Sequence, residues 1–142
     1  VMDGDLQHPP EVVGELITAL SGGADLVTAS RLPYREKQPL HRMLMTRFST
    51  LLAKHVLARR GFGISDPMSG LFAAKTELFR QTVEQCKTRF EPAGYKVLFD
   101  LLRCIRPEIF LSEVFYEFGV RSNGSSKLRP IHAFYFLRSV FK

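Results

Sequence analysis

Side chains with hard oxygen ligands alternate near the start of the sequence, at Asp3, Asp5 and Gln7. They follow two apolar residues and precede a Pro-Pro-Glu sequence, which is typical of the first turn of a helix. Mg²⁺ and Mn²⁺ prefer oxygen ligands and usually keep waters and substrate phosphates in their shell. The spacing therefore predicts a Mg²⁺ or Mn²⁺ site at Asp3, Asp5 and Gln7. An acidic helix cap is the alternative that this pattern alone leaves open.

Arginine and hydroxyl side chains suited to a phosphate follow. Arg31 comes directly after a short apolar stretch, and Arg42 and Thr46 lie four residues apart in a stretch with helical apolar spacing. Residues four apart share one face of a helix, where a guanidinium and a hydroxyl can converge on one anion. We expect Arg31, Arg42 and Thr46 to bind a phosphate. An ordinary solvent-facing helix arginine is the alternative for Arg42.

Two loops complete the set of candidates. Asp66, which a proline follows, and Ser69 belong to a tight loop whose backbone amides can meet a ligand. The second loop runs from Arg121 to Lys127 with a glycine, three serines and no acid, and such a loop can close over a diphosphate. We expect all four side chains to bind substrate or lie beside it. A turn cap for Asp66 and a flexible linker for the second loop remain open.

The apolar pattern predicts the elements that position these side chains. Short apolar strands alternate with amphipathic helices, which indicates an α/β domain. The strand over 24–30 is expected to return beside the strand that carries Asp3. In chain order we expect a helix over 11–20, a strand over 24–30, a helix over 40–57 with Leu40, Met43, Leu44, Phe48, Leu51 and Leu52 on its inner face, a strand over 71–74, helices over 75–85 and 94–106, and an edge or antiparallel strand over 109–118.

Length and composition fit one globular unit, since the chain has 142 residues of which 45% are hydrophobic. The two cysteines have no metal-binding spacing, so neither zinc nor a disulfide framework is expected. No apolar run reaches the roughly 18–20 residues needed to cross a bilayer. Any membrane contact is therefore expected to be peripheral, or to be made by parts outside this chain.

The net charge of +6 is concentrated in two blocks. Residues 31–60 hold eight Lys or Arg against one acid, and residues 119–142 hold five and no acid. Such blocks predict a surface for the phosphates of a lipid headgroup, a polyprenyl phosphate or a nucleic acid, with solvated helix faces as the alternative. Residues 129–142 are also aromatic, which predicts an interfacial helix on an anionic membrane. We therefore divide the chain into 1–128 and 129–142.

Four motifs together resemble a known family: Asp3 to Gln7, Ala29 to Arg31, Asp66 to Phe72, and Tyr116 to Leu128. In this order and at these separations they are similar to polyprenyl-phosphate glycosyltransferases, the dolichol-phosphate mannosyltransferase-like branch of the inverting GT-A enzymes. Relatives carry an Arg and, four residues later, a Ser where this chain has Arg42 and Thr46. The resemblance implies a GT-A fold truncated at its N-terminal nucleotide-binding half, because the chain matches only the second part of the family's catalytic domain.

The resemblance also implies a reaction. A sugar would pass from a nucleotide-diphosphate sugar to a polyprenyl phosphate, dolichyl or undecaprenyl, at the cytoplasmic face of a membrane. A phosphate acceptor is already anionic, so the reaction needs cations more than a general base. Catalysis is expected to involve Asp5, Asp66 and Arg121. Substrate binding is expected to involve Asp3, Arg31, Arg42, Thr46, Ser69, Arg121 and Lys127.

We expect this stretch alone to be inactive, because the half with the nucleotide contacts has no counterpart in it. The rival interpretation is an inactive fragment that serves as a basic module for anionic lipid or nucleic acid. No nucleic-acid-binding motif occurs in the sequence, so nucleic acid is not an expected partner.

Overall fold

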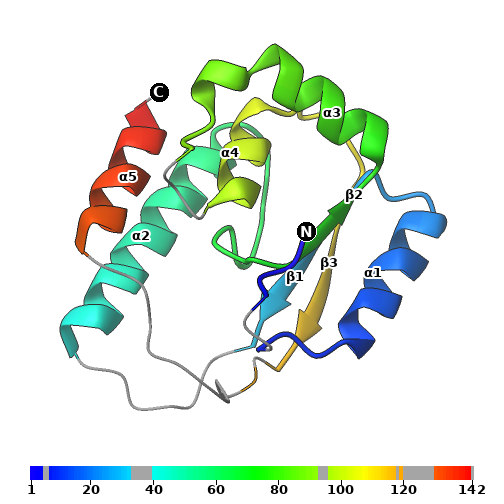
Figure 1. Cartoon of the computed structure of the whole chain (residues 1–142), viewed down its shortest axis with the longest axis horizontal. Helices are drawn as coiled ribbons and strands as arrows, with labels where there is room; N and C mark the ends of the chain where they lie inside the picture. The colour runs from blue at the N-terminus through cyan, green and yellow to red at the C-terminus, as the bar shows by residue number, and fades with distance from the viewer. Residues whose placement is uncertain (5–6, 33–39, 93–95, 118, 120–129, 142) are drawn as a thin grey trace.

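The computed structural model describes residues 1–4, 7–32, 40–92, 96–117, 119 and 130–141, apart from the side chains of residues 41, 42 and 130. A small sheet lies between helices (Figure 1). In chain order the elements are α1 (Glu11–Ser21), β1 (Leu26–Arg31), α2 (Leu40–Ala58), β2 (Phe72–Ala74), α3 (Thr76–Gln85), the 3-10 helix η1 (Lys87–Arg89), α4 (Val97–Cys104), β3 (Leu111–Tyr116) and α5 (Pro130–Phe141).

The sheet has three strands in the order β2-β1-β3 within the described residues. β1 pairs antiparallel with β2 and parallel with β3, so that Arg31 at its end lies opposite Tyr116. All residues of β1 except Arg31 are buried, because the strand is central and covered on both faces. The carboxyl ends of β1 and β3 therefore meet at one edge, where α/β sheets commonly bind ligands.

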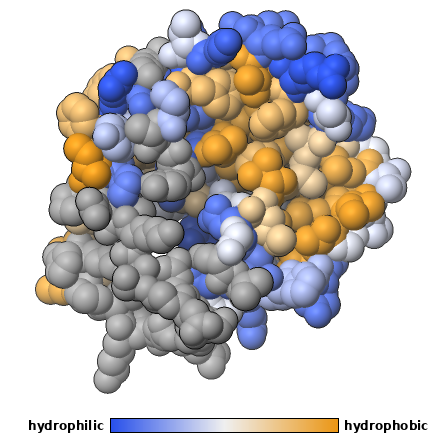
Figure 2. Space-filling view, viewed as in Figure 1, coloured by the Kyte–Doolittle hydropathy of each residue, from blue (hydrophilic) through white to orange (hydrophobic). Residues whose placement is uncertain are grey.

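Each face of the sheet has its own core, as side-chain alternation along a strand requires. Val12 and Leu16 of α1 pack with Val27 and Ala29 of β1 on one face. Leu26 and Phe72 belong to a larger cluster on the other, in which α4 is the most buried helix. In Figure 2 apolar residues lie over α4, the strands and α1, and polar residues of α3 frame them.

Residues 1 and 2 run beside β2, not beside β1 as the sequence led us to expect. The Val1 amino group donates to the Phe72 carbonyl at 2.9 Å, and the Phe72 amide donates to the Val1 carbonyl at 3.1 Å. These two bonds occupy the side of β2 that faces away from β1. The segment that carries Asp3 is therefore separated from β1 by β2, although it is not itself a strand.

The bounds expected for α2 are confirmed, but its inner face is wrong. Four of the residues expected in the core are exposed, and Ala53 and Leu57 near the end of the helix are buried instead. Apolar residues occur on several sides of this helix, so their periodicity did not determine which side meets the sheet. The exposed residues and their exposed fractions are Leu40 (66%), Leu44 (55%), Phe48 (62%) and Leu51 (68%).

The expected C-terminal helix exists as α5, and one of its sides packs on α4. Phe136 is buried with its ring centroid 5.3 Å from that of Phe99. The Ser139 hydroxyl donates to buried Asp100, and Arg103 donates to the Ser139 carbonyl. Burial is the main cause that raises the pKa of Asp100 above its ordinary value. These contacts attach α5 to the body of the protein.

Asp25, just before β1, connects the start of β1 with the end of the antiparallel β2 and the start of β3. Its carboxylate pairs with the Lys75 ammonium at 2.7 Å and accepts the Phe110 amide at 2.9 Å. The hydrogen bond from Lys75, followed by that from Phe110, lowers the pKa of Asp25 below its usual 3.8. A depressed pKa in the folded state stabilises the protein above the unfolded pKa, and that stability is lost as the pH falls through the folded value.

We therefore expect Asp25→Asn to lower the urea midpoint of unfolding at pH 7, with the difference from wild type shrinking as the pH falls below about 4. Urea titrations at pH 7 and at a pH below about 4 measure this difference. Glu15→Gln, which changes an exposed carboxylate on α1, is the control. A deficit that is the same at both pH values would contradict the assignment.

Candidate functional site

Arg31 and Asp66 form an ion pair at the carboxyl end of β1. Arg31 Nε donates to Asp66 Oδ2 at 2.6 Å, and the second bond, from Nη2 to Oδ1, is 3.1 Å long. The Met68 amide also donates to Oδ1, at 3.2 Å, so the Asp66 carboxylate also stabilises the turn that follows it. Burial disfavours the charged guanidinium, but the hydrogen bonds and charge of Asp66 outweigh it, and the pKa of Arg31 is raised.

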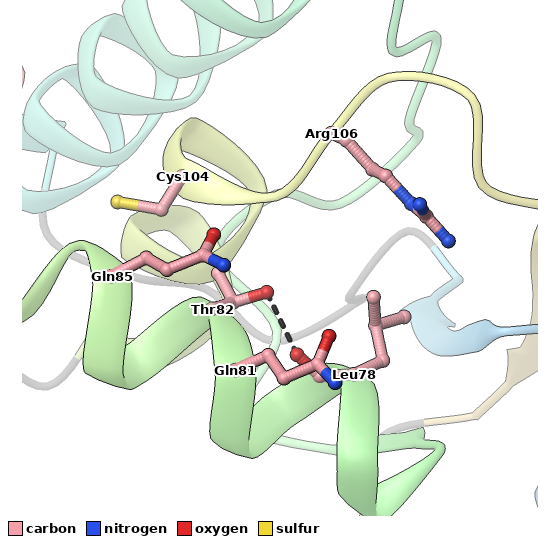
Figure 3. A pocket seen from close by; sticks show the side chains of 6 residues that line it. All are labelled: Leu78, Gln81, Thr82, Gln85, Cys104 and Arg106. Atoms are coloured by element: carbon pink, nitrogen blue, oxygen red, sulfur yellow. Dashed lines mark hydrogen bonds between the residues drawn. The ribbon is translucent and has the colours of Figure 1, made fainter.

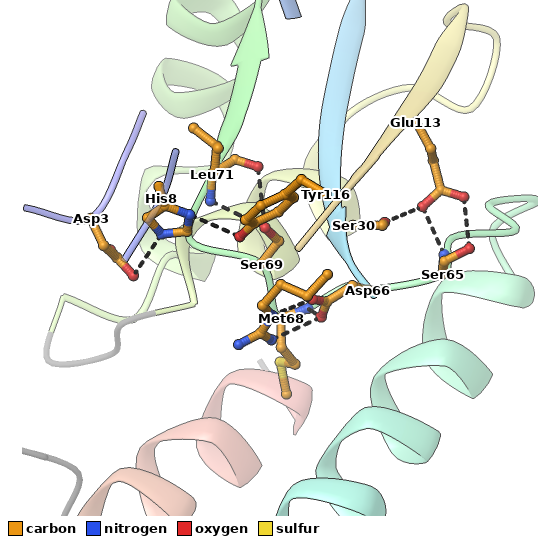
Figure 4. Close-up of polar contacts among 11 residues, drawn as sticks. Asp3, His8, Ser30, Ser65, Asp66, Met68, Ser69, Leu71, Glu113 and Tyr116 are labelled. Carbon is orange, nitrogen blue, oxygen red and sulfur yellow. Dashed lines mark hydrogen bonds and ion pairs between the residues drawn. The ribbon is translucent and has the colours of Figure 1, made fainter. Parts of the chain in front are cut away.

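A second polar chain runs from Tyr116 through His8 to Asp3 (Figure 4). The Tyr116 hydroxyl and His8 Nδ1 are 2.8 Å apart, and His8 Nε2 lies 4.0 Å from Asp3 Oδ2. Burial is the main cause that raises the pKa of Tyr116 to about 12, and the charges of Arg31, Asp66 and Asp3 also act on it. The phenol therefore stays protonated at neutral pH.

Lys96, just before α4, faces the same group of charges. Its side chain is half-buried. Burial, followed by the positive charge of Arg31, lowers the pKa of Lys96, while Asp66 and Asp3 act in the opposite direction. The repulsion between two neighbouring cations is offset when an anion binds between them. This arrangement suits a phosphate.

Close contacts involve the Asp3 carboxylate and both the side chain and the backbone of Gln7. A Cβ added at Gly70 would overlap the Asp3 carboxylate, so only glycine leaves room for that carboxylate in its present position. The Gln7 amide nitrogen donates to the Gly119 carbonyl at 3.1 Å, and the Gly119 amide returns a bond of 3.0 Å to the Gln7 carbonyl. Gln7 is thereby held beside Gly119, three residues after the end of β3.

The structure brings Asp3, Arg31, Asp66 and Ser69 into one neighbourhood. Ser69 is buried, and its hydroxyl bonds within the turn to the backbone of Leu71. Thr46 lies on an exposed side of α2, and no hydrogen bond among the described residues joins it to this group. Four candidates fall outside the described residues or have undescribed side chains: Asp5, Arg42, Arg121 and Lys127.

The donors near the expected metal site suit a hard cation. Asp3 offers a carboxylate whose side chain is 66% exposed, and Gln7 offers a buried amide. Within the described ranges no three His, Cys, Asp or Glu side chains cluster closely enough to hold a metal. Asp5, expected as a further ligand, lies outside these ranges. The chemistry of the set fits Mg²⁺ or Mn²⁺, and the site itself stays a prediction.

A cavity of about 200 Å³ lies elsewhere, between α3 and the end of α4 (Figure 3). Its lining is largely polar and includes none of the candidate residues. Burial raises the pKa of Cys104, one of its lining residues, to about 12, so this thiol is a poor nucleophile at neutral pH. The lining residues are Leu78, Gln81, Thr82, Gln85, Cys104 and Arg106.

Comparison with known proteins gives the family. A dolichol-phosphate mannosyltransferase from Pyrococcus furiosus is 35% identical over an alignment that covers 100% of this chain and 39% of the relative. The chain belongs to the dolichol-phosphate mannosyltransferase-like family. Two further relatives with that name, from Mycosarcoma maydis and Saccharomyces cerevisiae, are 33% and 32% identical over 89% of this chain and over 42% and 47% of their own lengths.

The family resemblance predicted from the motifs is thus confirmed, and the named relatives are glycosyltransferases. The chain spans less than half the length of each of these dolichol-phosphate mannosyltransferases. No protein-family model matches it.

Sequence reasoning missed His8, Tyr116 and Lys96 as members of the site. His8 follows Gln7 directly and Tyr116 ends an aromatic strand, so neither carried a signal of its own. Lys96 lies within the helix expected over 94–106, so it carried no signal of its own either. The clear signal of this helix was its apolar stripe, which predicts the buried face and not the binding site.

Proposed function

We propose that the protein carrying this chain transfers a sugar from a nucleotide-diphosphate sugar to a polyprenyl phosphate such as dolichyl phosphate. The observation that carries the proposal is that the charges of Arg31 and Asp3 both act on Lys96, in a chain that matches dolichol-phosphate mannosyltransferases over its length. We further propose that the α/β unit is part of a GT-A domain, with residues 1–128 on its metal and acceptor side.

Charge neutralisation is the main task that this reaction sets. The acceptor phosphate attacks as an anion, and the leaving diphosphate gains charge, so both must be held by cations. We propose that one phosphate binds both Arg31 and Lys96, because the charge of Arg31 acts on Lys96. Asp66 fixes the plane of the Arg31 guanidinium. Arg121 and Lys127 would add two more cations when their loop meets the substrate.

Asp3, Asp5 and Gln7 would hold Mg²⁺ or Mn²⁺. When bound, such an ion neutralises charge on a leaving diphosphate. His8 directs its Nε2 toward the Asp3 carboxylate, while its Nδ1 meets the Tyr116 hydroxyl. Gly70 leaves the space that this carboxylate occupies.

We expect two substitutions to weaken metal binding for different reasons. Asp5→Ala removes a ligand outright, and Gly70→Ala forces the Asp3 carboxylate to move because the new Cβ would overlap it. Asp3 is exposed, so the second change should leave the unfolding midpoint nearly unaltered. Water relaxation enhancement by Mn²⁺, with nucleotide diphosphate present, measures both, and Gly14→Ala on exposed helix surface is the control. Unchanged Mn²⁺ affinity in Asp5→Ala would contradict the proposed metal site.

We also propose that the protein works at the cytoplasmic face of a membrane and meets it peripherally through this chain. Two neighbouring helices, α2 and α5, expose large apolar side chains. None of the helices in the described ranges is long and apolar enough to span a bilayer. Arg138 belongs to the segment 129–142 that we expected at the lipid surface, but it pairs with Glu91 at 3.2 Å, so the apolar side chains are the stronger argument. On α5 these are Ile131, Phe134, Leu137 and Phe141.

Binding to anionic vesicles is expected to weaken when Phe48 of α2 and Phe134 of α5 are both replaced by serine. Each ring that enters the interface contributes on the order of 1 kcal/mol, less than the value for full burial. Sedimentation with anionic and neutral vesicles at low and high salt measures the loss. Phe110→Ser, just before β3 and similarly exposed, is the control. Unchanged binding of the double variant would contradict this location.

The function itself is tested by incubating the intact protein with nucleotide-diphosphate sugars, Mn²⁺ and dolichyl or undecaprenyl phosphate. The expected product is a polyprenyl-phosphate sugar, whose formation requires the metal and stops when Asp5 is replaced by alanine. Absence of product with every donor, together with tight binding to vesicles or duplex DNA, would favour the rival binding module.

A further inference from the structure

The Glu113 carboxylate joins the two segments that supply the Arg31–Asp66 ion pair. Oε1 accepts the Ser30 hydroxyl at 2.6 Å and the Ser65 amide at 2.9 Å, and Oε2 accepts the Ser65 hydroxyl at 3.0 Å. Figure 4 shows Glu113 reaching from β3 toward both serines. Three donors, two of them on one loop residue, fix the loop before Asp66 against the end of β1.

The Glu113 contacts and the Arg31–Asp66 ion pair link the same two dipeptides. Ser30 precedes Arg31, and Ser65 precedes Asp66. Neighbouring side chains of a strand point to opposite faces, so the serine contacts lie on one face of the sheet end and the ion pair on the other. If the Glu113 contacts are lost, the loop can move away from β1, and the short ion pair with bonds of 2.6 and 3.1 Å cannot keep its geometry.

We infer that Glu113 is a positioning residue for the proposed transfer, which sets the Arg31 guanidinium by holding Ser30 and Ser65 together. The inference rests on the proposed function for its catalytic consequence, and on the contacts alone for its structural part. Its carboxylate already accepts three hydrogen bonds, so Glu113 acts through Arg31 and does not touch the reacting groups. A misplacement of about 1 Å at a catalytic group costs on the order of 100-fold in rate.

The decisive variants are Glu113→Ala, which removes all three contacts, and Glu113→Gln, which restores them. The glutamine oxygen can accept from Ser30 and from the Ser65 amide, and its nitrogen can donate to the Ser65 hydroxyl. Glu117→Ala, an exposed carboxylate beyond β3, is the matched control. Slow exchange and a shifted resonance of the Arg31 Nε proton report the ion pair by NMR, whether or not the protein transfers sugar.

We expect Glu113→Ala to lose the Arg31 signal, and to lower kcat/KM by on the order of 100-fold, mainly through KM for the polyprenyl phosphate. Glu113→Gln and Glu117→Ala should resemble wild type in both measurements. An unchanged Arg31 signal in folded Glu113→Ala would overturn the inference. If that variant does not fold, Ser65→Ala decides in its place: a weakened Arg31 signal supports the inference and an unchanged one overturns it.

The two proposals fail separately. A wild-type protein that transfers no sugar, but whose Arg31 signal depends on Glu113, overturns the function and keeps the positioning. A protein that transfers sugar and whose Arg31 signal ignores Glu113 does the reverse.

Discussion

Replacing Asp66 by alanine is expected to lower the free energy of unfolding by about 2–4 kcal/mol. Removing one partner of a buried ion pair leaves the other charge without compensation, which typically costs 3–5 kcal/mol. The Asp66 side chain is only 12% exposed, but Arg31 is 34% exposed and regains some hydration, so the lower range applies. The variant also loses the acceptor for the Met68 amide, which adds to the cost.

Urea unfolding of Asp66→Ala, Arg31→Ala and the double variant measures this coupling through a double-mutant cycle. Asp66→Asn is the matched control, because it keeps a hydrogen-bond acceptor but loses the charge, and it should cost less than alanine. In the transfer assay Asp66→Ala should also weaken acceptor binding, since Arg31 loses its fixed plane. Additive single effects would show that the two side chains are not energetically coupled.

Arg121→Ala is expected to cost ~2–4 kcal/mol in transition-state stabilisation, or about thirty- to a thousand-fold in rate. Arg121 lies outside the described residues, so this prediction rests on the sequence of its loop and on the family. A guanidinium can hold a phosphate through two parallel hydrogen bonds, while lysine offers a point charge. Arg121→Lys should therefore lose much of the rate although it keeps the charge.

Steady-state kinetics with both substrates varied measure the effect of Arg121. The loss should appear chiefly against polyprenyl phosphate, with the affinity for the nucleotide sugar nearly unchanged. Arg80→Ala, an exposed arginine on α3, is the control for loss of one positive charge. Weaker nucleotide-sugar binding with an unaffected acceptor would instead assign Arg121 to the diphosphate.

The sequence predicted most elements because their signals are local. The Pro-Pro-Glu start and the Gly-Gly end bound α1, and β-branched residues mark β1. The inner face of α2 was wrong because packing, which is not local, decides which of several apolar sides is covered. The strand over 109–118 was expected at an edge or antiparallel; it lies at the edge of the described sheet and runs parallel to β1.

The site was only partly predictable for the same reason. Arg31 and Asp66 were each singled out by their neighbours in sequence, but nothing in either motif indicated that they pair with each other. Lys96 enters the site through the packing of α4, and Glu113 through a diagonal contact across two strands. Such relations depend on three-dimensional placement, so a single sequence does not reveal them.

The position of β1 at the centre of the sheet also bears on how the chain folds. Asp25, just before β1, accepts the amide of Phe110, 85 residues later in sequence. Pairing segments so far apart requires closing a long loop before any contact rewards it, and a high contact order of this kind slows folding. During synthesis β1 therefore emerges long before β3, its parallel neighbour. Until β3 has been made, the unpaired edge of this apolar strand can form non-native contacts.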